Sequence, residues 1–386
     1  FFFESEQMCK TEIQPKRNPR KASMGLPGTE FGNGDIPMPK PPITMEQLRK
    51  AIPEECFQKD LAKSLLYMLR DFAFIATLYW FRGSFFQFGL LGKFVWWNIT
   101  GFFGWALFVV GHDCGHETFS EYKWVNKLCG HICHTPLLVP FYGWKVSHHR
   151  HHSHHNHVDK DHSWKPFTKS EYDSFLSSPV SMWSRFHLPM LFLYPYYLIK
   201  ESQLYGFSGN HFNPLSPMFG PNDRIDAAIS SLSVIGYLVF LFANWSPGVL
   251  LECYFAPYLV FVAWLDMVTY LQHTDEKALY YRDGAWTYYL GALSTVDRTY
   301  GSVIDHLHHN IETHVLHHVF FTKIPHYNLV KATDAVKGLL GDYYIKDTTF
   351  FPLALWRSIH TCHYVPDDSL VVKYEKDPEW KGNKKA

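Results

Sequence analysis

The chain has no excess of charge of either sign, because 36 Lys and Arg residues balance 36 Asp and Glu residues. A nucleic-acid-binding domain usually carries a basic patch, so no nucleic-acid partner is expected. Cysteine is scarce and odd in number, with 7 residues that lack framework spacing, which argues against a disulfide-stapled secreted domain. Cys129 and Cys133 lie close together, but Cys-Gly-His-Ile-Cys-His matches no zinc or haem pattern, so free thiols are expected.

The first 43 residues lack the apolar run of a signal peptide and are rich in Pro, Gly and Lys. They are predicted to form a disordered polar tail. A short amphipathic helix is predicted to follow, starting at a Thr44 cap. A membrane domain is expected over 44–365, and a polar C-terminal tail over 366–386.

Four apolar stretches are each about 17–20 residues long, enough to cross the hydrocarbon core of a bilayer. Charges inside them leave buried helices of a soluble protein as the alternative. Spanning is the preferred interpretation, so we expect an all-α integral membrane protein with four transmembrane helices in two hairpins. A cytosolic helical cap would hold a His-rich di-metal site. The predicted spans are about 65–81, 94–110, 225–243 and 247–265.

Histidine is the abnormal residue, at 24 of 386. Twelve histidines fall between His112 and His162, and seven between His306 and His326. The first group follows the second predicted span and the other follows the fourth. An even number of crossings separates the groups, so both are expected on one side of the membrane.

The histidine spacings predict metal ligands. His-x-x-x-His and His-x-x-His-His place imidazoles at i, i+3 and i+4, on one face of a helix. Eight imidazoles are too many for one zinc, which takes four ligands, and they suit two metals with open positions. A loose metal-binding loop is the alternative for the run around His152. The predicted ligands form a first box (His112, His116), a second box (His148, His151, His152) and a third box (His314, His317, His318).

With these boxes, the chain resembles the membrane fatty-acid desaturases, specifically their methyl-end (Δ12/ω-6 and ω-3) branch. The resemblance covers about residues 70–345. Further matches are Thr269-Tyr-Leu-Gln-His-Thr274 and Gly291-Ala-Leu-Ser-Thr-Val-Asp-Arg-Thr-Tyr-Gly301. The form Gly-His-Asp-Cys-Gly-His of the first box leans to the ω-3 side. Glu312 departs from the family, whose members often have Gly there.

The resemblance implies two non-haem irons at the cytosolic face of the endoplasmic reticulum membrane and a hydrophobic tunnel for the acyl chain. A further histidine ligand is implied, with His273 the best match and His309 and His308 as other candidates. Since no His-Pro-Gly-Gly haem motif occurs, electrons are expected from separate cytochrome b5 and its NADH-dependent reductase.

The chemistry of the expected reaction agrees with a redox metal. Removing hydrogens from an unactivated methylene requires an oxidant stronger than any side chain, so a redox metal and O2 are needed. The expected activity is O2-dependent desaturation of a fatty-acyl lipid or acyl-CoA. Hydroxylation or epoxidation on the same scaffold is the alternative, and a metal transporter is a distant one. Carboxylates that are candidates to orient the imidazoles are Asp113, Asp159, Asp161 and Glu312.

Overall fold

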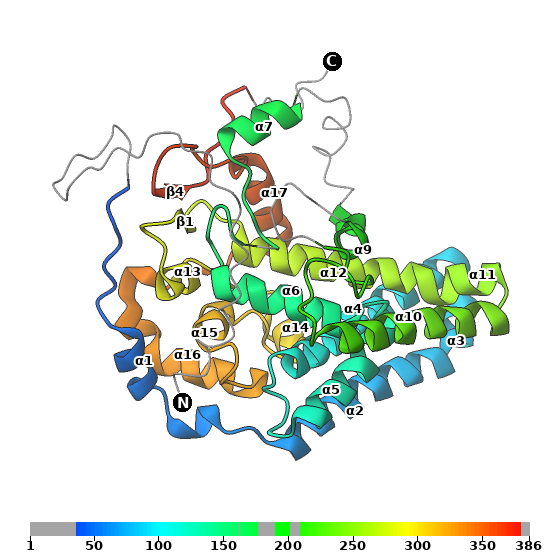
Figure 1. The fold of residues 1–386 in the computed structure, drawn as a ribbon. Coiled ribbons are helices and arrows are strands. Elements are labelled where there is room, and N and C mark those ends of the chain that lie inside the picture. The colour runs from blue at the N-terminus through cyan, green and yellow to red at the C-terminus, as the bar shows by residue number, and fades with distance from the viewer. Residues whose placement is uncertain (1–35, 162, 177–189, 201–208, 380–386) are drawn as a thin grey trace. The chain divides into compact units, whose positions relative to one another are not determined.

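Helices make up nearly all of the regular structure in this computed structural model (Figure 1). It describes residues 36–161, 163–176, 190–200 and 209–379, which fall within one unit, Asp35–Ala386. Most of the predicted N-terminal tail, the last residues of the C-terminal tail, His162 and His187 lie outside the described residues. The helices up to the second box are α1 (Met45–Ala51), a 3-10 turn (Glu54–Phe57), α2 (Leu61–Trp80), α3 (Arg82–Phe86), α4 (Gly89–Gly115), α5 (Lys123–His134), a 3-10 turn (Thr135–Leu137) and α6 (Phe141–His154).

The helices after the second box include two long apolar ones and several short ones. They are α7 (Lys169–Leu176), α9 (Met190–Ile199), α10 (Arg224–Asn244), α11 (Pro247–Leu250), a π-helical turn (Leu251–Phe255), α12 (Ala256–His273), α13 (Tyr288–Leu293), α14 (Ser302–Leu307), α15 (His314–Val319), α16 (His326–Leu340), a 3-10 turn (Gly341–Tyr343) and α17 (Phe351–Thr361).

Helix α1 begins at the predicted cap. The Thr44 hydroxyl accepts the backbone N–H of Gln47 at 3.2 Å, and the Gln47 side chain accepts the backbone N–H of Thr44 at 3.0 Å. This reciprocal pair satisfies two N–H groups that the first turn leaves without a helical partner. The sequence signal was therefore sufficient to locate this helix start.

Three helices in the described residues are long and apolar enough to cross a membrane: Gly89–Gly115, Arg224–Asn244 and the continuous run Pro247–His273. They match the second, third and fourth predicted spans. The first predicted span corresponds to α2, a helix of 20 residues that is not among them. Its Lys63, Arg70 and Asp71 lower its apolar character, so the structure supports three candidate spans rather than four.

The helices extend beyond the predicted spans, and this extension carries histidines. Helix α4 continues past Val110 to Gly115 and includes His112, while α12 continues past Leu265 to His273. Helices α10 and α12 run in opposite directions and α12 packs along α4 (Figure 1). The C-terminal ends of α4 and α12 therefore lie at the same end of the pair, so that His112 and His273 border one cavity.

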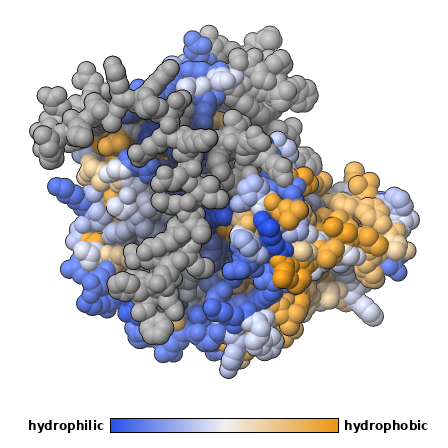
Figure 2. Space-filling view, viewed as in Figure 1, coloured by the Kyte–Doolittle hydropathy of each residue, from blue (hydrophilic) through white to orange (hydrophobic). Residues whose placement is uncertain are grey.

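The helix surfaces differ in what they expose. The apolar window of α4 is 67% buried, whereas that of α10 is only 28% buried. Helix α10 exposes large apolar side chains such as Ile225, Leu232 and Val239. Figure 2 shows hydrophobic residues gathered on the side of the molecule where Figure 1 places α10 and α11. An exposed apolar surface of this kind is typical of contact with lipid.

Two small sheets lie among the described residues. Strand β1 (Leu279–Tyr281) pairs antiparallel with β4 (Val371–Lys373), and β2 (Asp297–Arg298) pairs parallel with β3 (Lys346–Asp347). Strand β4 lies within the stretch predicted as a polar C-terminal tail. The structure therefore differs from that prediction, because Val371 and Val372 are buried and their strand pairs with β1.

Candidate metal centre

The first box lies at the C-terminal end of α4. The Nε2 atoms of His112 and His116 are 3.1 Å apart, as expected for imidazoles one helical turn apart. Two glycines allow neighbouring rings to approach this end of the helix. A Cβ on Gly111 would lie 2.2 Å from the His134 ring, and a Cβ on Gly115 would lie 2.6 Å from the Trp144 ring. Close packing against these rings therefore explains why glycine occupies both positions in Gly-His-Asp-Cys-Gly-His.

The second box lies on α6. The Nε2 atoms of His148 and His152 are 3.2 Å apart. His151 is one turn from His148 but points to the other side of the site, where its ring lies 4.7 Å from that of His273. The second box therefore reaches toward two different groups of histidines.

The third box forms α15, whose N-terminus is fixed by a carboxylate. Asp297 Oδ1 accepts the backbone N–H groups of His314 and Val315 at 2.6 and 2.7 Å. His314 Nε2 lies 2.9 Å from His318 Nε2 and 3.0 Å from His273 Nε2. The third box thus meets His273, which comes from the end of α12.

The structure brings all eight box histidines and His273 together in two adjoining groups. Five of them, from all three boxes, have nitrogens within 4.8 Å of one another, and so do three others, His151, His273 and His318. His314 joins the smaller group through its contacts with His273 and His318. The five of the larger group are His112, His116, His148, His152 and His317.

The donor set fits metal ions. Two nitrogens bound to the same metal ion at ~2.1 Å, with a right angle between the two bonds, lie ~3 Å from each other. The Nε2 separations of 2.9–3.2 Å within the boxes match this distance. His317 Nε2 is buried and has no hydrogen-bond partner. Buried polar atoms usually have partners, and bound cations would be the partners for this concentration of nitrogen lone pairs.

Burial keeps these imidazoles neutral. It lowers the pKa of His116, His148 and His152 well below the usual value of 6.5, and the neighbouring imidazoles lower each pKa further. The same causes act on the third box, His314, His317 and His318. Only a neutral imidazole offers a lone pair to a metal, so the rings are held in the form that binds.

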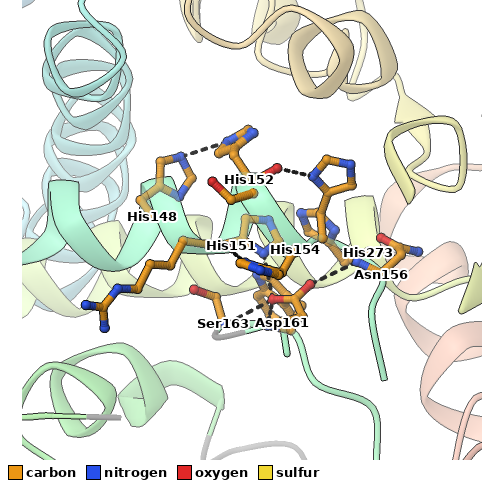
Figure 3. Close-up of polar contacts among 12 residues, drawn as sticks. His148, His151, His152, His154, Asn156, Asp161, Ser163 and His273 are labelled. Carbon is orange, nitrogen blue, oxygen red and sulfur yellow. Dashed lines mark hydrogen bonds and ion pairs between the residues drawn. The ribbon is translucent and has the colours of Figure 1, made fainter. Parts of the chain in front are cut away.

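Asp161 orients His151 (Figure 3). The Nδ1 of His151 donates to Oδ1 of Asp161 at 2.7 Å, since an ionised carboxylate can only accept. Burial opposes ionisation of Asp161, but His151 and backbone N–H donors lower its pKa overall. Because Nδ1 carries the proton, the lone pair of His151 is on Nε2, the nitrogen that faces the site.

The other three candidate carboxylates have different surroundings. Asp113 accepts the Nδ1–H of His326 at 2.8 Å and lies 3.7 Å from Nδ1 of His112. Asp159 is exposed, and its backbone N–H, not its carboxylate, contacts the His157 ring. Glu312 Oε2 is buried with no hydrogen-bond partner, and burial raises the pKa of Glu312 to about 8. Neither Asp159 nor Glu312 is seen to orient a box histidine.

His308 and His309, the other candidates for the additional ligand, point elsewhere. His308 Nε2 donates to the carbonyl of Phe102 at 3.2 Å. His309 Nε2 donates to Asp71 at 2.6 Å, and Arg70 lies beside both. Of the three candidates, only His273 lies in a group of histidines that could hold a metal.

His155 adjoins both groups, since it forms a third set with His152 and His318 whose nitrogens lie within 4.8 Å of one another. Its ring nitrogens also lie 2.5 Å from the carbonyl of His152 and 3.0 Å from that of Tyr288. Four further histidines have a ring nitrogen in contact with a backbone carbonyl. They are His134, His211, His360 and His363.

A cavity of about 430 Å³ opens onto the histidines and is called here the main cavity. Its apolar walls come from α4, α9, α12 and α17, and its histidines include members of all three boxes. Sequence reasoning expected a tunnel but not its residues, since distant helices supply them. The residues that border it include Trp105, Phe108, Tyr194, Leu265, Tyr270 and Ile359.

The fold and site define a helical protein with apolar helices of membrane-spanning length and a buried cluster of histidines able to hold metal ions beside an apolar cavity. A model of the family described as fatty acid desaturase matches residues 89–351. The chain belongs to the fatty acid desaturase family, as its three boxes predicted, and the relatives below agree with the methyl-end branch.

The relatives are similar along nearly their whole length. A protein of Nostoc sp. named sn-1 acyl-lipid omega-3 desaturase (ferredoxin) is 44% identical, covering 87% of this chain and 92% of that protein. A protein of the same name from Synechocystis sp. is 40% identical, covering 88% and 94%. The acyl-lipid omega-3 desaturase (cytochrome b5), endoplasmic reticulum, of Arabidopsis thaliana is 40% identical, covering 89% and 90%.

Proposed function

We propose that this desaturase inserts a cis double bond at the ω-3 position of an unsaturated acyl chain carried by a membrane lipid. The observation that carries the proposal is the convergence of the box histidines and His273 at an apolar cavity of about 430 Å³. The ω-3 position and the lipid carrier are supported by the names of relatives 40–44% identical to this chain.

In this proposal, two non-haem irons are held by the two groups of histidines. His112, His116, His148, His152 and His317 would hold one, and His151, His273, His314 and His318 the other. When bound, the irons supply the redox chemistry with O2 that no side chain can supply. Imidazole alone does not select iron, so it is the oxidation of an unactivated methylene that requires it.

The chain's own residues position the reactants. Asp161 fixes the tautomer of His151, and burial keeps the imidazoles neutral. The apolar walls of the main cavity exclude water and hold a methylene chain beside His112, His148 and His151. Positioning of this kind decides which carbons react, and an error of about 1 Å can cost about 100-fold in rate.

The membrane arrangement is also proposed. Helices α4, α10 and α11–α12 would cross the bilayer, and α2, with 20 residues, would complete a set of four. The ends of α4 and α12 that carry His112 and His273 would then lie on one face, which we place in the cytosol. The ion pair of Arg70 with Asp71 and the hydrogen bond from His309 to Asp71 would satisfy the charges of α2.

The electron donor and the compartment are tested together. Relatives are named for ferredoxin and for cytochrome b5, and for the chloroplast and the endoplasmic reticulum. We retain the sequence-based prediction of the endoplasmic reticulum with cytochrome b5 and its NADH-dependent reductase. Membranes containing the enzyme are supplied with NADH and this pair, or with reduced ferredoxin. Faster product formation with ferredoxin would overturn the prediction.

The function is tested by expression in yeast fed linoleate, followed by gas chromatography and mass spectrometry of the fatty acids. The expected product is a triene with the new double bond three carbons from the methyl end, and a His151→Ala control should make none. A hydroxylated or epoxidised product, or no product from a stably inserted enzyme, would contradict the proposal.

A further inference from the structure

A second cavity shares helices α4 and α12 with the main cavity. Its volume is about 290 Å³, and we call it the inner cavity. No residue borders both cavities. Along α4, Gly101, Gly104 and Leu107 border the inner cavity. Trp105, Phe108, Val109 and His112, on the same helix, border the main cavity. The two cavities are therefore neighbours along α4.

Successive residues of helix α12 also border first one cavity and then the other. Pro257, Tyr258 and Phe261 border the inner cavity, and Leu265, one turn later, borders the main cavity. The point where one cavity gives way to the other lies at the same level on α12 and α4, because Gly104 lies against Phe261. A Cβ on Gly104 would be 3.2 Å from the Phe261 Cβ. The cavities are thus stacked end to end between the two helices.

Two aromatic rings form the partition between the cavities. Phe108 borders the main cavity and Phe261 borders the inner cavity, and their ring centroids are 5.8 Å apart. Only 4% of Phe108 and 1% of Phe261 is exposed. The Tyr194 ring packs edge-on against Phe108 at 6.0 Å, and the Tyr258 ring lies 5.7 Å from Phe261. The partition is therefore packed on both sides.

The partition lies close to the histidines. Phe108 is four residues before His112 on α4, which is about 6 Å along the helix axis. Trp105 and Leu265 also border the main cavity. An acyl chain that enters with its methyl end first can pass the histidines by only a few carbons before it meets these side chains. A tail of three carbons fits in such a space.

We propose that Phe108 and Phe261 are specificity-determining residues: their rings stop the methyl end of the acyl chain and so set the position of the double bond from that end. This inference rests on the proposed function. The inner cavity is space that the partition withholds from the substrate. Opening the partition lets the methyl end pass deeper, so that carbons farther from it reach the histidines.

The test replaces Phe261 with Ala and, because a large deletion can destabilise the core, also with Leu. Leu241→Ala is the matched control, since Leu241 is a large buried side chain that borders the inner cavity from α10. Each variant is expressed in yeast that supplies oleate, whose carbons near the methyl end are all saturated. Mass spectrometry locates every new double bond, and immunoblotting of membranes gives the amount of enzyme.

The expected result is a rise in products with the double bond farther than three carbons from the methyl end. Hydrophobic pockets discriminate one methylene by about 10–200-fold. We therefore expect the ratio of these shifted products to the ω-3 product to rise at least about tenfold in Phe261→Ala and less in Phe261→Leu. Leu241→Ala should keep the wild-type ratio.

Three results would overturn the inference. They are an unchanged ratio in both Phe261 variants, an equal shift in Leu241→Ala, and loss of all product from both Phe261 variants at wild-type enzyme amounts. If the wild-type enzyme itself makes no new double bond from oleate or linoleate, the proposed function fails instead.

Discussion

The Nδ1 of His151 lies 2.7 Å from Oδ1 of Asp161, and at most 2% of either side chain is exposed. The carboxylate also accepts the backbone N–H groups of Asn156, Ser163 and Trp164. These bonds fix the carboxylate, and the carboxylate fixes the imidazole. Orientation of a metal-binding histidine by a carboxylate typically contributes 10–100-fold in metal affinity or activity.

Replacing Asp161 with Asn should therefore weaken metal binding. We expect the desaturation rate and the iron retained after purification to fall about 10–100-fold, while the amount of membrane-inserted enzyme stays near wild type. Asp159→Asn is the control, because Asp159 is exposed. Equal effects of the two substitutions would show that Asp161 does not act through His151.

His273 and His309 should respond differently to removal. His273→Ala takes a nitrogen from the smaller group of histidines, so the iron content should fall below that of the wild type. His309→Ala leaves Asp71 buried with Arg70 as its remaining partner. His309 is neutral, because burial lowers its pKa to about 4. Removing a hydrogen-bond donor from a buried carboxylate costs about 1–3 kcal/mol, so this variant should unfold at lower temperature but bind metal normally in its folded fraction.

Metal analysis and thermal unfolding of both purified variants check this prediction. Loss of iron from folded His309→Ala with retention in His273→Ala would reverse the assignment of the additional ligand.

Gly115 should tolerate no side chain. A Cβ there would lie 2.6 Å from the Trp144 ring, which shares α6 with the second box. Gly115→Ala should cost about 1–3 kcal/mol through overpacking and lower the iron content by moving α6. Gly236→Ala on α10 is the control, since a Cβ at Gly236 meets nothing within 4 Å. Thermal unfolding should separate the two; equal midpoints would contradict the packing.

Acid should destabilise the fold through buried histidines outside the metal groups. Burial lowers the pKa of His308 from 6.5 to about 3. Neutral His308 therefore contributes its full stability above pH ~6.5. As the pH falls below that value, the unfolded chain takes up a proton that the folded chain does not, and stability decreases until the pH approaches about 3.

His308→Gln isolates this contribution. Each such group gives a slope of up to about 1.4 kcal/mol per pH unit, and the variant should show a slope smaller by about that amount between pH 6 and 4 in denaturant unfolding. A slope identical to that of the wild type would show that His308 is not neutral and buried in solution.

The sequence predicted what depends on local spacing. Imidazoles at i and i+4 on a helix face one another whatever the rest of the fold does, so the pairing of His112 with His116 and of His148 with His152 could be predicted. The expectation that the third box lies on the same side of the membrane as the other two came from counting the apolar stretches between them. His273 was identified only by resemblance, because nothing local marks a single histidine at a helix end.

The sequence could not predict contacts that depend on tertiary packing. Asp159 and Asp161 are the same residue type and lie two positions apart, yet of these two only Asp161 accepts a hydrogen bond from a box histidine. Asp113 meets His326, 213 residues away, and Asp71 meets His309, 238 residues away. Asp71 lies inside the first predicted span, and the fold places it, buried, beside Arg70 and His309. The partition of Phe108 and Phe261 likewise forms only when α4 and α12 pack.

Whether the two groups of histidines each hold one iron is measured by the metal content of the purified enzyme. Inductively coupled plasma mass spectrometry, normalised to quantitative amino-acid analysis, should give two irons per chain and fewer in variants of either group such as His116→Ala and His314→Ala. One iron per chain, or zinc in place of iron in an enzyme that desaturates, would contradict the proposal that each group holds one iron.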